Sequence, residues 1–201
     1  MTIVAHDERT LAFYASEAET YVAKGWDGLN PDLTVFLNRL KPGARVLELG
    51  CGSGRDAAAM LERGFDVDPT DGSPEMARQA EKRIGRPVRV MRFDALNANA
   101  DYDAVWASAS LLHVPRQALV GVLARIHRAL RPGGQHFASY KGGTREGRDE
   151  FGRFFNYPSA DYLRAIYRSA GDWAAFDLES STGTGYDKRV TPSHAVRATR
   201  R

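Results

Sequence analysis

The sequence predicts a doubly wound α/β fold, with a mostly parallel sheet that helices cover on both faces. Short apolar runs alternate along the chain with longer amphipathic stretches, which is the order expected when helices connect parallel strands. A glycine-rich turn stands where the first strand should pass into the following helix. The 201 residues suffice for one domain with a sizeable core but not for two, so we expect one domain over 1–201.

The expected elements follow one another in a regular order. Two helical segments, near 10–24 and 32–40, form an N-terminal helical cap within residues 1–43. Apolar runs then predict strands at 45–49, 65–71, 88–92, 102–107 and 136–140. Amphipathic stretches between them predict helices at 55–63, 74–84 and 115–130. The second of these helices has Ser73 as a typical N-cap, followed by Pro74 at the first helical position.

The C-terminal part of the chain departs from this alternation. A helix is expected over 160–170, followed by strands at 173–179 and 193–199, which we interpret as an antiparallel pair that completes the sheet. One residue conflicts with the scheme. Pro69 lies near the end of the second expected strand, where proline has no N–H to donate to a neighbouring strand.

Composition and charge exclude several classes of protein. The single cysteine, Cys51, rules out an intramolecular disulfide and a cysteine-rich zinc site, and we expect no bound metal. The net charge is +3, with 28 basic residues spread among 25 acidic ones, so we expect no nucleic-acid partner. No apolar run has membrane-spanning length and no signal peptide is recognisable, so we expect no membrane association and a cytoplasmic location. We also expect a monomer or a homodimer.

The most informative segment joins the first expected strand to the helix after it. Glycines at alternate positions, Gly50, Gly52 and Gly54, permit a tight turn and let a ligand approach bare backbone. The N-terminus of the following helix offers free N–H groups to an anion. Glu48, just before the turn, would repel a pyrophosphate but suits a ligand with a cationic amino group. S-adenosylmethionine carries such a group, together with a carboxylate and a sulfonium.

Two further acids stand at the ends of expected strands. Asp71 ends the second strand, where a carboxylate can accept hydrogen bonds from two ribose hydroxyls. Asp94 follows the third strand, where it could accept one from an adenine amino group. Ligands of open α/β sheets bind at the carboxyl ends of the strands, which is where both acids and Glu48 fall. The alternative is that Asp71 and Asp94 cap strand ends or form turns.

Residues 46–140 resemble the class I S-adenosylmethionine-dependent methyltransferases, in particular their small-molecule or tellurite-resistance-like branch. The resemblance rests on the glycine turn and on the runs 102–107 and 130–134. It implies a seven-stranded sheet with an antiparallel last strand, and S-adenosylmethionine as the cofactor. The cofactor contacts that it implies are Glu48, Gly50, Cys51, Gly52, Gly54, Arg55, Asp71, Gly72, Asp94, Ala95 and Ala107.

The resemblance also implies a role for each part of this set. The glycines would cradle the methionyl and ribose parts, Asp71 would hold the ribose, and Asp94 with Ala95 would meet the adenine. The backbone near Ala107 would line the methionyl pocket. Arg55 either pairs with the methionyl carboxylate or is a solvated residue at the helix start. Glu48 could alternatively be a buried structural carboxylate.

The acceptor side of the site is less well defined by the sequence. The stretch 107–113 lacks the Asn/Asp-Pro-Pro-Tyr/Phe segment typical of enzymes that methylate amino groups of nucleobases or glutamine. Cys51 lies inside the cofactor turn and is interpreted as a packing residue, not as a nucleophile for carbon-5 methylation of cytosine. The segment 141–157 mixes glycines, charges and aromatic residues and is predicted to be a substrate lid. The candidate substrate-binding residues are Tyr14, Tyr21, His113, Lys141 and Arg153.

Each of these candidates also has a structural interpretation. Tyr14 and Tyr21, together with Trp26, could be packing residues. His113 could also be a packing residue. The predicted lid could be a charge-balanced surface loop in which Arg153 pairs with an exposed acid such as Asp149 or Glu150.

Methyl transfer from this cofactor is an in-line displacement at a carbon that the sulfonium already activates. The protein has chiefly to align the acceptor with the methyl group and to exclude water, and no general base or other catalytic residue can be assigned. We expect a small-molecule acceptor. One alternative is an NAD(P)-dependent oxidoreductase of Rossmann type, although its turn is usually Gly-x-Gly-x-x-Gly and here Arg55 follows Gly54. The other is a non-catalytic, cofactor-binding regulatory protein.

Overall fold

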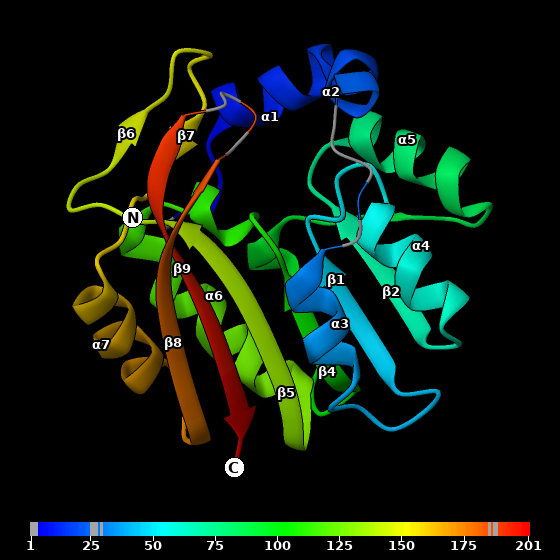
Figure 1. Cartoon of the computed structure of the whole chain (residues 1–201), viewed down its shortest axis with the longest axis vertical. Helices are drawn as coiled ribbons and strands as arrows, with labels where there is room; N and C mark the ends of the chain where they lie inside the picture. The colour runs from blue at the N-terminus through cyan, green and yellow to red at the C-terminus, as the bar shows by residue number, and fades with distance from the viewer. Residues whose placement is uncertain (1–3, 25–27, 29, 185, 187–188) are drawn as a thin grey trace.

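Seven strands form one sheet in the computed structural model, in the order β3-β2-β1-β4-β5-β9-β8 (Figure 1). The structure describes residues 4–24, 28, 30–184, 186 and 189–201. The strands of the sheet are β1 Arg45–Leu49, β2 Asp66–Asp71, β3 Arg89–Val90, β4 Tyr102–Ala107, β5 Leu130–Lys141, β8 Trp173–Thr184 and β9 Val190–Arg200. The strand order reverses between β1 and β4, as in doubly wound folds, and the predicted fold class is confirmed.

The last strand is the only antiparallel member of the described sheet. β1 to β5 pair in parallel, whereas β9 pairs antiparallel with β5 on one side and with β8 on the other. The expected antiparallel pair is therefore present, and both strands are longer than predicted. Their ladder extends to the pair Thr184 and Val190, through polar residues and Gly183, because backbone hydrogen bonds do not require an apolar pattern.

Helices cover both faces of the sheet. They are α1 Glu8–Ser16, α2 Ala18–Lys24, α3 Pro31–Leu37, α4 Arg55–Glu62, α5 Pro74–Ile84, α6 Arg116–Ala129 and α7 Ala160–Ala170. Leu47 and Val105 belong to the core shared with α6 and α7, whereas Val46 and Trp106 belong to the core shared with α3 and α4. Alternate residues of β1 and β4 thus serve opposite faces, which explains their continuous apolar character. Among the described helices, none combines the length and apolarity needed to cross a membrane.

The N-terminal cap differs from the prediction in detail. The stretch 10–24, expected as one helix, forms α1 and α2, with a break at Glu17. α1 begins before the predicted start because the Asp7 carboxylate accepts a hydrogen bond from the Thr10 N–H at 2.9 Å and caps the helix. Both helices lie across the top of the molecule in Figure 1, at the end towards which β5 points.

Two irregularities of the sheet have local causes. Pro69 is tolerated in β2 because β3 pairs with β2 only at the next two residues, so no strand on that side needs a proline N–H. β5 begins at Leu130, earlier than predicted. Its pairing with β4 shifts register before resuming at Gln135, so the Pro-Gly-Gly run at 132–134 forms a bulge.

Candidate active site

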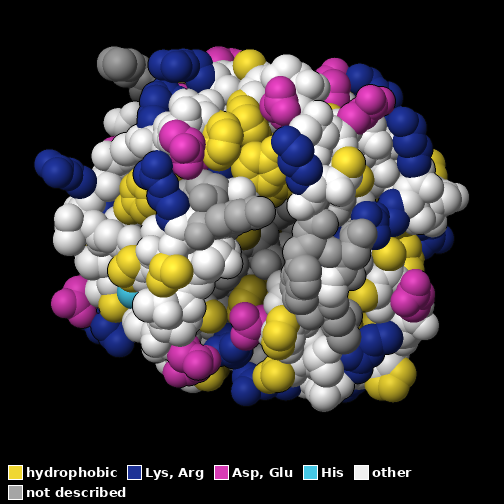
Figure 2. All heavy atoms as spheres, turned by 45° about the horizontal axis from the view of Figure 1, so that its top comes forward, with side chains coloured by type: hydrophobic (Ala, Val, Ile, Leu, Met, Phe, Trp, Pro, Cys, Tyr) yellow, Lys and Arg dark blue, Asp and Glu magenta, His cyan; other side chains and the backbone are white. Residues whose placement is uncertain are grey.

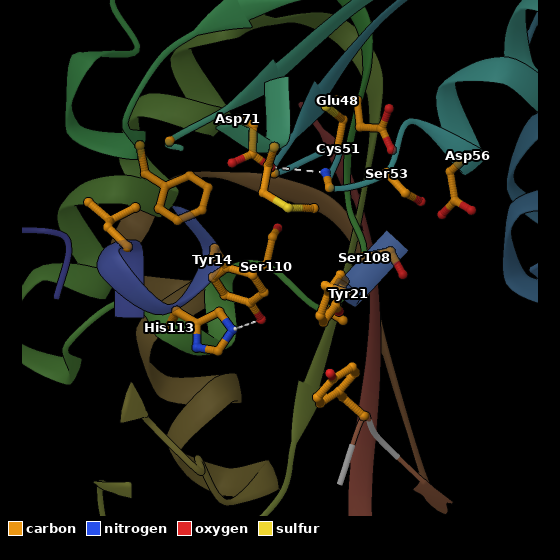
Figure 3. Close-up of a pocket in the computed structure, with 18 of the residues that line it drawn as sticks. Tyr14, Tyr21, Glu48, Cys51, Ser53, Asp56, Asp71, Ser108, Ser110 and His113 are labelled. Carbon is orange, nitrogen blue, oxygen red and sulfur yellow. Dashed lines mark hydrogen bonds between the residues drawn. The ribbon is translucent and has the colours of Figure 1, made fainter. Parts of the chain in front are cut away.

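A cavity of about 1030 Å³ opens at the carboxyl ends of β1, β2 and β4 (Figure 3). The predicted site residues that line it are Tyr14, Tyr21, Glu48, Gly50, Cys51, Gly52, Arg55, Asp71, Gly72 and His113. The predicted residues outside its lining are Gly54, Asp94, Ala95, Ala107, Lys141 and Arg153. Figure 2 turns this end of the molecule forward and shows basic and acidic side chains intermixed over it. The fold thus brings the N-terminal tyrosines and His113 to the same cavity as the glycine turn.

The glycine turn is shaped by close packing as well as by backbone conformation. Gly50 has φ of 74°, and a Cβ there would lie 2.6 Å from the Cβ of Ser110. Gly54 has φ of 73°, and a Cβ there would lie 3.0 Å from the backbone of Ala80 in α5. The first glycine therefore lets the segment after β4 approach the turn, whereas the third lets two helices pack closely. This packing role explains why Gly54 does not line the cavity.

Glu48 is a buried carboxylate that lacks part of its hydrogen bonding. It is 3% exposed, and its Oε2 atom has no partner among the described residues. Burial raises the pKa of Glu48 well above its usual value, and the negative charges of Asp56 and Asp71 raise it further. A buried carboxylate of this kind is costly unless a donor or a cation meets it. The amino group of a methionyl ligand fits this requirement.

Asp71 is held by the glycine turn and by the start of α5. Its Oδ2 accepts from the Gly52 N–H and its Oδ1 from the Ser73 N–H, both at 2.9 Å. The Gly72 N–H is a third backbone donor to this carboxylate. Of its four acceptor positions one therefore remains, which can accept from a ribose hydroxyl. Burial raises the pKa of this carboxyl to about 6, although the backbone hydrogen bonds oppose the shift.

The sequence analysis missed Asp56, which lies in the first turn of α4. It is 6% exposed and lines the cavity. Its Oδ2 accepts from the Trp106 indole N–H at 2.9 Å, and its Oδ1 accepts from the Arg55 Nε–H at 2.9 Å. Arg55 is therefore ion-paired at the cavity wall and is not a freely solvated residue. The available signal was an acid directly after the glycine turn, at the start of a helix.

Near residues 93–95 and after β4, the cavity is lined by residues adjacent in sequence to the predicted ones. Phe93 lines it, whereas Asp94 and Ala95 in the same 3₁₀ helix, η1 (Phe93–Ala95), do not. Ala107 is fully buried in β4, and the cavity is lined instead by the next residues, 108–110. Ser110 is 6% exposed and its hydroxyl has no hydrogen-bond partner among the described residues.

Tyr14 and His113, which both line the cavity, contact each other. The Tyr14 hydroxyl lies 3.0 Å from His113 Nε2 and accepts from Arg153 Nη1 at 3.2 Å. His113 Nδ1 lies 2.6 Å from the carbonyl oxygen of Phe154. Burial lowers the pKa of His113 to about 4 and raises that of Tyr14, so both side chains are uncharged at neutral pH.

Arg153 holds the predicted lid against α1 and does not reach the cavity. It pairs with Asp149 at 2.7 Å, and both side chains are 3% exposed. The pairing with Asp149 agrees with the surface-loop alternative, but the expectation that the pair is exposed is wrong. Aromatic rings surround the Arg153 guanidinium at 5.0–5.8 Å and bury it, namely Phe13, Tyr14, Phe151, Phe155 and Tyr186.

The Lys141 ammonium lies 4.8 Å from the centroid of the Phe155 ring. Trp26 lies outside the described residues.

Comparison with known proteins agrees with this geometry. Residues 46–134, which contain the glycine turn, match the family model of the methyltransferase domain. The ubiquinone biosynthesis O-methyltransferase of Xylella fastidiosa is 31% identical over 156 residues, which are 67% of this chain and 63% of that protein. The chain belongs to the class I S-adenosylmethionine-dependent methyltransferases. The protein-L-isoaspartate O-methyltransferase of Gloeobacter violaceus is 37% identical over 103 residues, covering 48% of this chain and 50% of that protein.

Solved structures show the same methyltransferase fold over nearly the whole chain. The 1,6-didemethyltoxoflavin-N1-methyltransferase of Burkholderia thailandensis superposes with a TM-score of 0.71 at 24% identity, over 100% of this chain and 92% of that one. A methyltransferase of Methanosarcina mazei has a TM-score of 0.72 at 17% identity, over 86% of this chain and 98% of that one. The chain spans about half to 63% of the length of the curated relatives described above. Membership of the family rests on the sequence matches, whereas these structures show the shared fold alone, and the branch stays a prediction.

Proposed function

We propose that the protein is an S-adenosylmethionine-dependent methyltransferase that transfers a methyl group to a small-molecule acceptor by in-line displacement. The observation that carries this proposal is the meeting of three features in one cavity. These are the carboxylate oxygen of Glu48 that has no partner among the described residues, the glycine turn, and Asp71 with a free acceptor position. The proposal accounts for a buried carboxylate that the described residues leave unsatisfied.

Each part of the cofactor has a matching group in the cavity. Glu48 would accept hydrogen bonds from the amino group, and the N-terminus of α4 with Arg55 would receive the methionyl carboxylate. Asp71 would accept from a ribose hydroxyl. The adenine would lie beside η1, where Phe93 lines the cavity and Asp94 follows it. The bound cofactor supplies the activated methyl group.

The protein contributes binding, orientation and exclusion of water. A cavity of about 1030 Å³ is at the upper end of the usual range of small-molecule sites, roughly 300–1,000 Å³, so a small acceptor can lie beside the cofactor. Alignment of two reactants in one site can account for about 7–11 kcal/mol of barrier reduction. A protein nucleophile is therefore unnecessary, and burial raises the pKa of the Cys51 thiol, which keeps it protonated.

The cap (1–43) and the lid (141–157) would enclose the reactants as parts of a single domain over 1–201. Tyr14 and Tyr21 of the cap line the cavity. Arg148 of the lid donates to both carboxylate oxygens of Asp7, at 2.9 and 2.7 Å. This ion pair connects the cap to the lid.

Titration calorimetry tests the cofactor assignment directly. S-adenosylmethionine and S-adenosylhomocysteine should bind, whereas NAD and NADP should not. Micromolar binding of NAD without a response to S-adenosylhomocysteine would refute the proposal and restore the oxidoreductase alternative, which the comparisons do not support. Release of S-adenosylhomocysteine in a screen of small acceptors separates an enzyme from a non-catalytic binding protein. The cytoplasmic location and the monomeric or homodimeric state stay predictions.

A further inference from the structure

Two hydroxyl groups on the acceptor side of the cavity are candidates for contacting the methyl acceptor. Figure 3 shows Tyr14 and His113 close together, with Ser110 between them and Asp71. Ser110 also packs against the glycine turn, as its contact with Gly50 requires. Its buried hydroxyl lacks a partner among the described residues, which is unusual and points to a ligand atom.

The hydrogen-bond chain through Tyr14 defines what that hydroxyl can do. His113 Nδ1 faces the carbonyl oxygen of Phe154, so Nδ1 carries the proton and donates. Nε2 must then accept, and the Tyr14 hydroxyl donates its only hydrogen to it. Arg153 Nη1 donates to the phenolic oxygen and occupies one of its lone pairs. The remaining lone pair is shared with Tyr21, which also hydrogen-bonds Tyr14. Tyr14 can therefore accept a hydrogen bond from a ligand that replaces Tyr21 there, but it cannot donate one.

The same chain leaves His113 without a free position for a substrate proton. Both of its ring nitrogens have partners, and burial beside Arg153 keeps its pKa near 4. The described carboxylates that line the cavity are Glu48 and Asp71, assigned to the cofactor, Asp56, paired with Arg55, and Asp7, whose pKa the bidentate hydrogen bond from Arg148 lowers. An alcohol or phenol that must lose its proton before it attacks therefore has no base among the described residues on this side.

Aromatic side chains form the remaining wall of this region. Tyr21 and Tyr186 both line the cavity and stack on each other, with ring centroids 4.9 Å apart and planes at 23°. Phe151 of the lid lines the cavity beside them. A wall of this kind favours a flat, aromatic ligand over a branched, polar one.

We propose that the methyl acceptor is an amino group attached to an aromatic ring, and that Tyr14 and Ser110 contact this group. This proposal rests on the methyltransferase function. The nitrogen lone pair forms the new N–C bond while the C–S bond breaks and its electron pair goes to sulfur. Positive charge develops on nitrogen during this step, so an N–H to Tyr14 hydrogen bond strengthens in the transition state. The proton leaves to solvent after the transfer.

Matched pairs of compounds test the acceptor class. Aniline and phenol, 5-aminoindole and 5-hydroxyindole, and 3-aminoquinoline and 3-hydroxyquinoline differ only in the attacking group. Release of S-adenosylhomocysteine and the mass of the methylated product would be measured for each. We expect turnover of at least one amine, at a rate at least about tenfold above its hydroxyl partner. Faster turnover of the hydroxyl compounds, or no turnover of any amine although S-adenosylhomocysteine binds, would overturn the acceptor assignment. Absence of S-adenosylhomocysteine binding would instead refute the proposed function itself.

Substitution of Tyr14 tests its contact with the acceptor. Tyr14→Phe removes the accepting oxygen, and loss of one hydrogen bond should lower kcat/KM for the amine by about tenfold. The ratio of amine to hydroxyl turnover should fall with it, which a merely structural defect would not cause. Tyr162→Phe is the matched control, because that hydroxyl donates to the Arg116 carbonyl and Tyr162 is not part of the cavity lining. An unchanged ratio in Tyr14→Phe would refute the contact. If Tyr14→Phe does not fold, Ser110→Ala should lower kcat/KM several-fold, and an unchanged value would count against the proposal.

Discussion

Replacing Arg153 with alanine should destabilise the protein strongly, because the Asp149 carboxylate would remain buried without its partner. The two side chains are each 3% exposed and their charged atoms are 2.7 Å apart. Removing one member of a buried ion pair costs about 3–5 kcal/mol, a large part of the roughly 5–15 kcal/mol that stabilises a typical domain. Arg153 also lies within 5.0 Å of the Phe13 ring centroid, so the loss of this contact acts in the same direction.

Urea unfolding followed by circular dichroism measures this loss. At a slope of about 2 kcal/mol per molar urea, the midpoint should fall by about 1.5–2.5 M. Arg164→Ala is the control, because its pair with Asp161 is exposed and such pairs contribute about 0–1 kcal/mol. Replacing both members of the buried pair, as in Arg153→Met with Asp149→Leu, should recover part of the loss, since no charge is then left unpaired. Recovery is incomplete because the backbone N–H groups of residues 151 and 153 lose Asp149 Oδ1 as their acceptor. A midpoint for Arg153→Ala no lower than that of Arg164→Ala would refute the argument from burial.

Three further predictions concern the cavity. Asp71→Ala should weaken S-adenosylhomocysteine binding by about 10- to 150-fold in calorimetry, since a hydrogen bond to a charged group contributes roughly 1.5–3 kcal/mol; an unchanged Kd in a folded variant would remove Asp71 from the site. The pKa of Asp71 is raised to about 6, and that of Glu48 is raised well above its usual value. The native state therefore binds more protons at these two groups than the unfolded chain does. As a result, the cofactor-free protein loses stability as pH rises from about 4 through 6 and above. Glu48→Gln should therefore raise the melting temperature of the cofactor-free protein near pH 7.5 while weakening cofactor binding, and a lower melting temperature would contradict this. Because burial lowers the pKa of His113 to about 4, nitrogen-15 NMR should detect its neutral Nδ1–H tautomer between pH 6 and 8, and an imidazolium signal there would disprove the assigned hydrogen bonds.

Features that depend on local interactions are predictable from the sequence alone. β1 and β4 have the predicted bounds because an apolar run between turn signals needs no distant information to be recognised as a buried strand. The caps of α5 and α7 are serines, Ser73 and Ser159, whose side chains accept from N–H groups three residues on. Glu48 and Asp71 were predicted for the same reason, since the carboxyl ends of neighbouring parallel strands meet at one edge.

Which distant residues come together at the cavity depends on tertiary packing. Tyr14 and His113 are 99 positions apart and meet because α1 packs over the segment after β4. The lid pair of Arg153 and Asp149 has a spacing that the sequence shows, but its burial comes from rings of α1, the lid and Tyr186. Burial, pKa and hydrogen-bond capacity depend on several elements packed at once, and no single stretch of sequence contains that information.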